Sequence, residues 1–104
     1  MPLQPLTEEQ RAAAREKAKK ARVTRADIKD AVKNKQITIA EVLKRAETDE
    51  AVARLKVTDL LTSLPGVGEV RTENILKELN IAASRRLRGL GIHQRKALIN
   101  LLDR

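Results

Sequence analysis

The sequence predicts an all-α protein, in which a long N-terminal helix precedes a compact domain of short helices. Apolar residues recur at spacings of three and four along most of the 104 residues, which is the spacing of one helix face. Thr7 and Thr38 each precede a first turn that contains glutamate, a pattern typical of helix N-termini. No segment alternates between apolar and polar residues for long enough to indicate a β-strand.

The first helix is expected to span residues 8–34, with Thr7 as its N-cap. One unbroken apolar stripe runs along it and consists of Ala14, Ala18, Ala21, Ile28 and Val32. A second capping box at residues 24–27 would split the helix in two, an alternative that the unbroken stripe disfavours. Because the helix is so polar, we expect it either to lie across the body by its alanines or to project as an arm.

Five shorter helices are expected after it. They begin at the capping box of residues 38–41, at Thr48 and Asp49, at Val57, after Gly68, and near residue 92. Their inward-facing residues are expected to be Ile39, Val42, Leu43, Ala46, Val52, Leu55, Leu60, Leu61, Leu64, Ile75, Leu76, Leu79, Leu98, Leu101 and Leu102. The helix after Gly68 also carries Val70. The chain contains no Phe, Trp or Tyr, so these aliphatic side chains must build the core.

The composition excludes several classes of function. With no cysteine and a single histidine, His93, the chain cannot build a thiolate or histidine metal site, and no cofactor is expected. No nucleophile stands with a base at a catalytic spacing, so we expect neither an enzyme nor a small-molecule substrate. Residues 1–4 lack an apolar leader, and no apolar run reaches the roughly 18 residues of a membrane span. A cytoplasmic location without membrane contact is therefore expected.

The formal net charge of +8 is concentrated at the two ends of the chain. Residues 1–22 hold six basic and three acidic residues, residues 23–82 hold ten of each, and residues 83–104 hold six basic residues and one acid. This pattern predicts two basic patches and makes a polynucleotide backbone the first candidate ligand. Since no aromatic ring is present to stack on unpaired bases, a duplex bound through its backbone is expected.

The segment 64–71 carries the motif Gly66-Val67-Gly68 between two predicted helices. Glycines at this spacing let the backbone take positive φ and approach a ligand closely. The helix that follows points unpaired N–H groups and the positive end of its dipole at the turn. The motif therefore predicts a phosphate seat, with Val67 facing the core. A plain connection between helices is the alternative interpretation.

The densest basic cluster spans residues 84–91 and ends in a second Gly-x-Gly motif. A brief helical turn there would anchor Leu87 and Leu90 in the core while the arginines project as phosphate clamps or enter a minor groove. Either leucine could also wedge a base step and bend the duplex. Arg95 and Lys96 follow at the start of the last helix, where cations oppose the helix dipole and so indicate an external anion.

Three stretches together resemble the actinobacterial integration host factor family of nucleoid-associated proteins: residues 3–11, 64–71 and 84–91. The resemblance covers essentially the whole chain. It implies a helix-two-turn-helix domain at 36–104, preceded by a basic helical arm at 1–35. It also implies binding to double-stranded DNA with weak sequence preference, changes in DNA topology or bending, nucleoid organisation, and support of phage integration alongside an integrase.

Carried onto this chain, the resemblance implies DNA contacts at both Gly-x-Gly turns and just after them. These residues are Gly66, Val67, Gly68, Val70, Arg71, Arg85, Arg86, Arg88, Gly89, Gly91, Arg95 and Lys96. One departure stands out, because the family commonly places lysine directly after the first Gly-x-Gly and this chain has Glu69. A carboxylate there opposes a phosphate, so Glu69 either turns away or weakens the first seat.

Two other functions are considered. A ribosomal small-subunit protein has the same fold and a similar Pro-Gly-Val-Gly stretch, so binding of structured RNA is the main alternative. DNA glycosylases with this domain begin Met-Pro, as this chain does, and use the proline amine as nucleophile. Leu3 replaces the glutamate that those enzymes need, and 104 residues leave no room for their catalytic domain.

Overall fold

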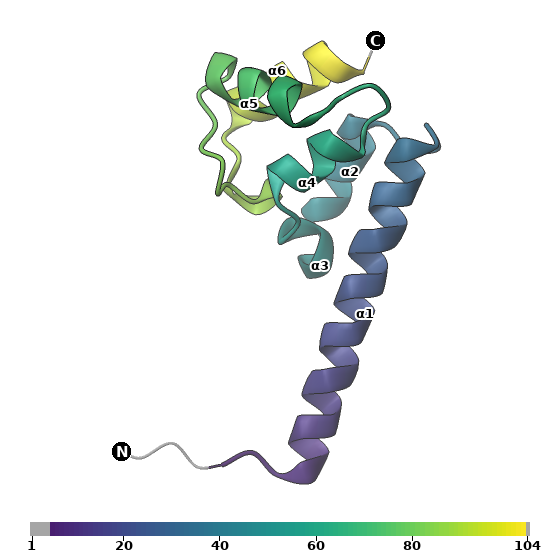
Figure 1. Ribbon diagram of the computed structural model, residues 1–104. Coiled ribbons are helices and arrows are strands. Elements are labelled where there is room, and N and C mark those ends of the chain that lie inside the picture. Colours follow the sequence, from purple (N-terminus) through teal and green to yellow (C-terminus); the bar gives the residue numbers. More distant parts are fainter. Residues whose placement is uncertain (1–4, 104) are drawn as a thin grey trace.

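The computed structural model describes residues 5–103, in which helices are joined by turns and short connections (Figure 1). The elements are α1 (Glu8–Lys33), α2 (Ile39–Ala46), α3 (Glu50–Ala53), α4 (Val57–Ser63), α5 (Glu69–Glu78), the 3-10 helix η1 (Leu87–Gly89) and α6 (Ile92–Leu102). Within this part of the chain, the β-type pairing is confined to one isolated bridge between Lys56 and Arg86. The predicted all-α fold with a long N-terminal helix is confirmed.

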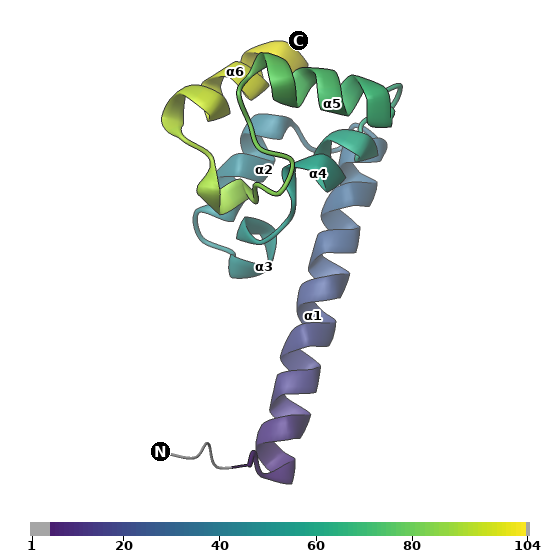
Figure 2. The same cartoon turned by 60° about the vertical axis from the view of Figure 1, so that its left-hand side comes forward.

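Helix α1 is a single helix of 26 residues. It begins at a capping box, in which the Thr7 hydroxyl accepts from the Gln10 amide (3.1 Å) and the Gln10 side chain accepts from the Thr7 amide (2.9 Å). The predicted continuity through Arg25 is confirmed. In Figures 1 and 2, the C-terminal half of α1 lies against the other helices, and its N-terminal half extends away from them as an arm.

The core lies between the C-terminal part of α1 and the shorter helices. Ile28 and Val32 of α1 are buried in it, together with aliphatic residues from each later element. The division of the chain at residue 35 therefore stays a prediction, because the core draws on residues from both sides of it. Among residues 5–103, no helix combines the length and hydropathy that crossing a membrane requires.

Most residues predicted to face inward do so. Leu87 and Leu90 are buried, and Val67 packs against the core while remaining partly exposed. Val70 is not one of them: its residue surface is 73% exposed, and its role as a DNA contact stays a prediction. In the first turns of α5 the residue that faces the core is Thr72, which lies two positions after Val70.

Candidate nucleic-acid interface

The connection between α4 and α5 is a tight turn that requires glycine at one position. The Val67 amide donates to the Leu64 carbonyl (3.1 Å), and Gly66 between them has φ +78°. Proline followed by a residue of positive φ is the signature of a type II turn. Gly68 then serves as the N-cap of α5 without any side-chain cap, and the space where its Cβ would stand is open. The first amides of α5 are thus accessible to a ligand.

The side chains around this turn are of mixed charge. Glu69 and Val70 are exposed at the start of α5, where Arg71 is also exposed. These residues line a groove of about 630 Å³ that reaches α6 and is also bordered by Glu78. The geometry of a phosphate seat is present, but two carboxylates lie in the groove beside it.

The second turn, around η1, is attached to the connection between α3 and α4. The Val57 amide donates to the Arg85 carbonyl (3.0 Å), and the Leu87 amide donates to the Leu55 carbonyl (3.0 Å). Leu87 and Leu90 fix the turn from inside, as predicted. Because both side chains are buried in the core, neither is free to enter a base step, and the expectation that one acts as a wedge is wrong.

The three arginines of this turn differ in their partners. Arg85 donates through Nη1 to the Gly89 carbonyl (2.7 Å), and Arg86 donates through Nη1 to the Arg54 carbonyl (2.6 Å). Within residues 5–103, no hydrogen bond or ion pair engages the Arg88 side chain. All three residues are exposed, but only Arg88 has its full set of donors available.

The start of α6 is held by internal bonds. The Gly91 amide donates to the Gln94 side chain (3.0 Å), whose Nε2 donates to the Asn80 carbonyl (2.8 Å). Gly91 therefore already has an acceptor for its N–H. Gln94, which the sequence analysis did not single out, ties the beginning of α6 to the end of α5.

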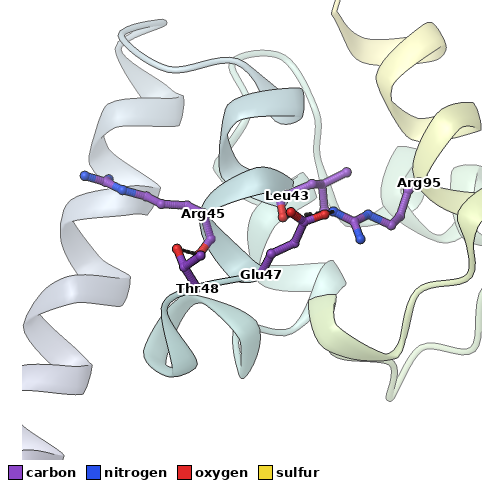
Figure 3. A network of polar contacts seen from close by, with 5 residues as sticks. All are labelled: Leu43, Arg45, Glu47, Thr48 and Arg95. Carbon is purple, nitrogen blue, oxygen red and sulfur yellow. Dashed lines mark hydrogen bonds and ion pairs between the residues drawn. The ribbon is translucent and has the colours of Figure 1, made fainter.

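Arg95 also has partners within the protein. Its Nη2 donates to the Leu43 carbonyl (3.0 Å) and lies 2.9 Å from Glu47 Oε1 (Figure 3). The side chain is 30% exposed and reaches from α6 to the C-terminal end of α2. An external anion was expected beside Arg95, but the Glu47 carboxylate of the protein itself occupies that position. Lys96 is exposed.

A basic groove of about 920 Å³ lies between α1 on one side and α3, α4 and η1 on the other. Its basic lining residues are Lys17, Lys20, Arg22, Arg25, Lys29, Arg54, Lys56, Arg86 and Arg88. Its acidic lining residues are Asp49, Glu50 and Asp59. Glu50 is paired with Arg54 at 2.7 Å. With nine cations against three acids, this is a strongly basic concave surface, and such a surface attracts polyanions.

The chain is similar to known proteins over nearly its whole length. The S13-like H2TH domain family matches residues 32–101. The integration host factor of Mycolicibacterium smegmatis is 52% identical over 103 residues, which are 99% of this chain and 98% of that protein. The integration host factor of Streptomyces coelicolor is 49% identical over 94 residues, or 90% of this chain and 88% of that one. This chain belongs to the integration host factor family.

A solved structure supports the same assignment. A structure of sIHF bound to an 8bp palindromic DNA has a TM-score of 0.81 to this chain, with 41% sequence identity, and covers 84% of this chain and 98% of that one. The predicted family and helix-two-turn-helix fold are therefore confirmed.

This integration host factor homologue does not bring all of its predicted site residues together. In both views the α4–α5 connection lies beside the C-terminal end of α1, whereas the η1 turn lies on the other side of the body, near α3 (Figures 1 and 2). Gly68, Val70 and Arg71 line the α5–α6 groove, and Arg86 and Arg88 line the basic groove. The two turns thus present separate surfaces.

The basic groove also includes Arg54 and Lys56, which were not predicted as site residues, whereas a basic patch on the N-terminal helix was expected. Arg54 and Lys56 flank the α3–α4 connection, and Lys20 and Arg25 lie on the facing side of α1. They join Arg88 only through the packing of α1 against α3 and α4. Apart from the excess of basic residues in α1, no sequence motif indicates that these side chains lie on one surface.

Proposed function

We propose that this protein is a DNA-architectural protein that binds double-stranded DNA through the sugar–phosphate backbone. The observation that carries the proposal is the basic groove, because its cations come from four elements and converge on one concave surface. The structure of the homologous sIHF bound to DNA supports the choice of duplex DNA as the ligand. We expect binding rather than catalysis.

The groove favours backbone contacts over base readout. Lysine and arginine side chains that meet phosphates set position and affinity but carry little sequence information. The buried Leu87 and Leu90 hold η1 in place, so Arg88 is presented to the groove on a fixed turn. Weak sequence preference follows from this set of contacts.

The α4–α5 turn is proposed as a second backbone contact. The uncapped amides of α5 next to Gly66 and Gly68 are suited to a phosphate oxygen, and Arg71 is exposed nearby. Because this turn and η1 lie on different sides of the body, they would meet separate stretches of backbone (Figure 2). Such a protein would alter DNA topology, and roles in nucleoid organisation and in phage integration with an integrase are the finer parts of the proposal.

The experiment is a mobility shift of a short duplex titrated with salt. About five phosphate contacts predict a slope of log K against log salt of roughly −4 to −5. A variant with Arg88, Lys56 and Lys20 all changed to alanine should bind weakly and with a clearly shallower slope. A slope near zero for the natural protein would contradict the proposal.

Binding to structured RNA is the second candidate, because the matching family is S13-like. The same basic groove would serve either polyanion. Competition of structured RNA against duplex DNA at fixed salt separates the two, and we expect the protein to bind the duplex more tightly.

A further inference from the structure

We propose that the three arginines of the η1 turn have different roles in binding. Arg86 and Arg85 are positioning residues that hold the turn in shape, and Arg88 is the member that contacts the phosphate. This inference rests on the proposed binding of duplex DNA in the basic groove.

Arg86 donates a hydrogen bond to the Arg54 carbonyl, which lies at the C-terminal end of a helix. Arg54 is the C-cap of α3, and its carbonyl lies 2.6 Å from Arg86 Nη1. Carbonyl groups at a helix C-terminus lack intrahelical partners and carry the negative end of the helix dipole. A hydrogen bond from a cationic guanidinium to such an oxygen is stronger than one between neutral groups.

The same bond completes a set of three attachments. Two backbone hydrogen bonds flank Arg86, one from Val57 to Arg85 and one from Leu87 to Leu55, both of 3.0 Å. The 3-10 helix itself has three residues and no side-chain cap, so it contributes little order of its own. The position of η1 relative to α3 and α4 therefore depends on these three bonds together with the buried leucines.

Arg85 holds the turn from the other end. Its Nη1 donates to the Gly89 carbonyl, which closes the side chain over the turn. A Cβ on residue 89 would stand 2.9 Å from Arg85 Cδ, so the absence of a side chain at Gly89 is what lets Arg85 adopt this position. Arg85 does not line the basic groove, whereas Arg86 and Arg88 do.

Arg88 is placed differently. It lines the groove opposite α1 and has no partner among the described residues, so a phosphate can bind it without breaking any bond of the protein. A phosphate that recruited Arg86 would have to compete with the Arg54 carbonyl. The free energy gained from a phosphate at Arg86 is reduced by what that bond contributes.

Two readouts on Arg86→Ala and Arg88→Ala test this division. The slope of log K against log salt counts phosphate contacts, and hydrogen exchange of the Val57 and Leu87 amides in the DNA-free protein reports the attachment of η1. For Arg88→Ala we expect the slope to become shallower by about 0.9, with exchange unchanged. For Arg86→Ala we expect weaker binding with the natural slope, and faster exchange of both amides.

Lys77→Ala is the matched control, because Lys77 is an exposed cation of α5 outside both grooves. It should change neither readout. Arg86→Lys keeps a donor of similar reach and should restore most of the exchange protection. If Arg86→Ala makes the slope shallower by as much as Arg88→Ala does, Arg86 is a phosphate contact and the division is refuted. If the natural protein shows no salt-dependent binding, the proposed function fails, while the exchange experiment still decides the role of Arg86.

Discussion

The Asp103 side chain caps the first turn of α2, which begins 64 residues earlier at Ile39. Oδ1 of Asp103 accepts from the Ile39 amide and Oδ2 accepts from the Ala40 amide, both at 2.8 Å. A carboxylate at a helix N-terminus meets unpaired N–H groups and the positive end of the dipole. Thr38 supplies a local cap to the Glu41 amide at the same end. The end of α6 is thereby bonded to the beginning of the compact domain.

Replacing Asp103 with alanine removes two charge-assisted hydrogen bonds and leaves two amides of α2 without protein acceptors. We expect the free energy of unfolding to fall by about 2 kcal/mol, measured by urea denaturation. Asp27→Ala is the control, because Asp27 is an exposed acid on α1, and it should cost far less. Equal values for the two variants would show that the cap contributes no stability.

Thr72 offers a gain in stability. Its residue is 2% exposed, and its hydroxyl is a buried polar atom with no hydrogen-bond partner in the described structure. Thr72→Val keeps the branched shape and removes the unsatisfied group, so we expect the free energy of unfolding to rise by about 1 kcal/mol. Thermal denaturation followed by circular dichroism checks this. A lower midpoint would mean that the hydroxyl is satisfied.

Substitutions of Gly68 and of Gly66 test the proposed phosphate site at the α4–α5 turn in different ways. Gly68 has an extended backbone and open space around it, so Gly68→Ser introduces a favourable N-cap. The new hydroxyl should stabilise the fold by about 0.5 kcal/mol while taking an amide from the incoming phosphate and weakening duplex binding. Unchanged duplex binding by this variant would mean that the first amides of α5 are not part of the proposed interface.

Gly66→Ala is expected to act on the fold. The φ of +78° is unfavourable for any residue with a Cβ, so this variant should lose about 1 kcal/mol of stability. Its duplex affinity, measured well below its unfolding midpoint, should change less than that of Gly68→Ser. The opposite order of the two affinities would contradict the assignment of roles to the two glycines.

Asp59 places a carboxylate in the basic groove. Asp59→Asn removes a negative charge that faces the proposed phosphates, so the duplex should bind about two- to fivefold more tightly at low salt. The gain should shrink as salt increases, because screening weakens the repulsion. Asp27→Asn, an equal change of charge on α1 outside the groove lining, should give a smaller gain. Equal gains would mean that only net charge matters.

Local signals made much of the fold predictable. Thr7 and Thr38 mark helix starts, Pro65 with Gly66 marks the turn, and the Ile28–Val32 spacing places α1 against the core. The inward face of α5 was harder to predict, because this helix has apolar residues on more than one side and the choice between Val70 and Thr72 for the core depends on tertiary packing. Periodicity within ten residues cannot decide that choice.

The candidate site was less predictable for the same reason. The cluster at 84–91 is visible in the sequence, but the bond from Arg86 to the Arg54 carbonyl joins residues 32 positions apart. Arg95 likewise meets Glu47 and Leu43 only because α6 packs against α2. Sequence spacing identifies which cations are present, while the packing of the helices decides which of them remain available to a ligand.

The central claim is that duplex DNA binds in the groove between α1 and η1. The most direct measurement is a titration of ¹⁵N-labelled protein with a short duplex, followed by amide and arginine side-chain chemical shifts. We expect the largest changes at Arg88, Lys56 and the groove-facing residues of α1, such as Lys20 and Arg25. Changes confined to α2 and the C-terminal part of α6, with the groove residues unaffected, would contradict it.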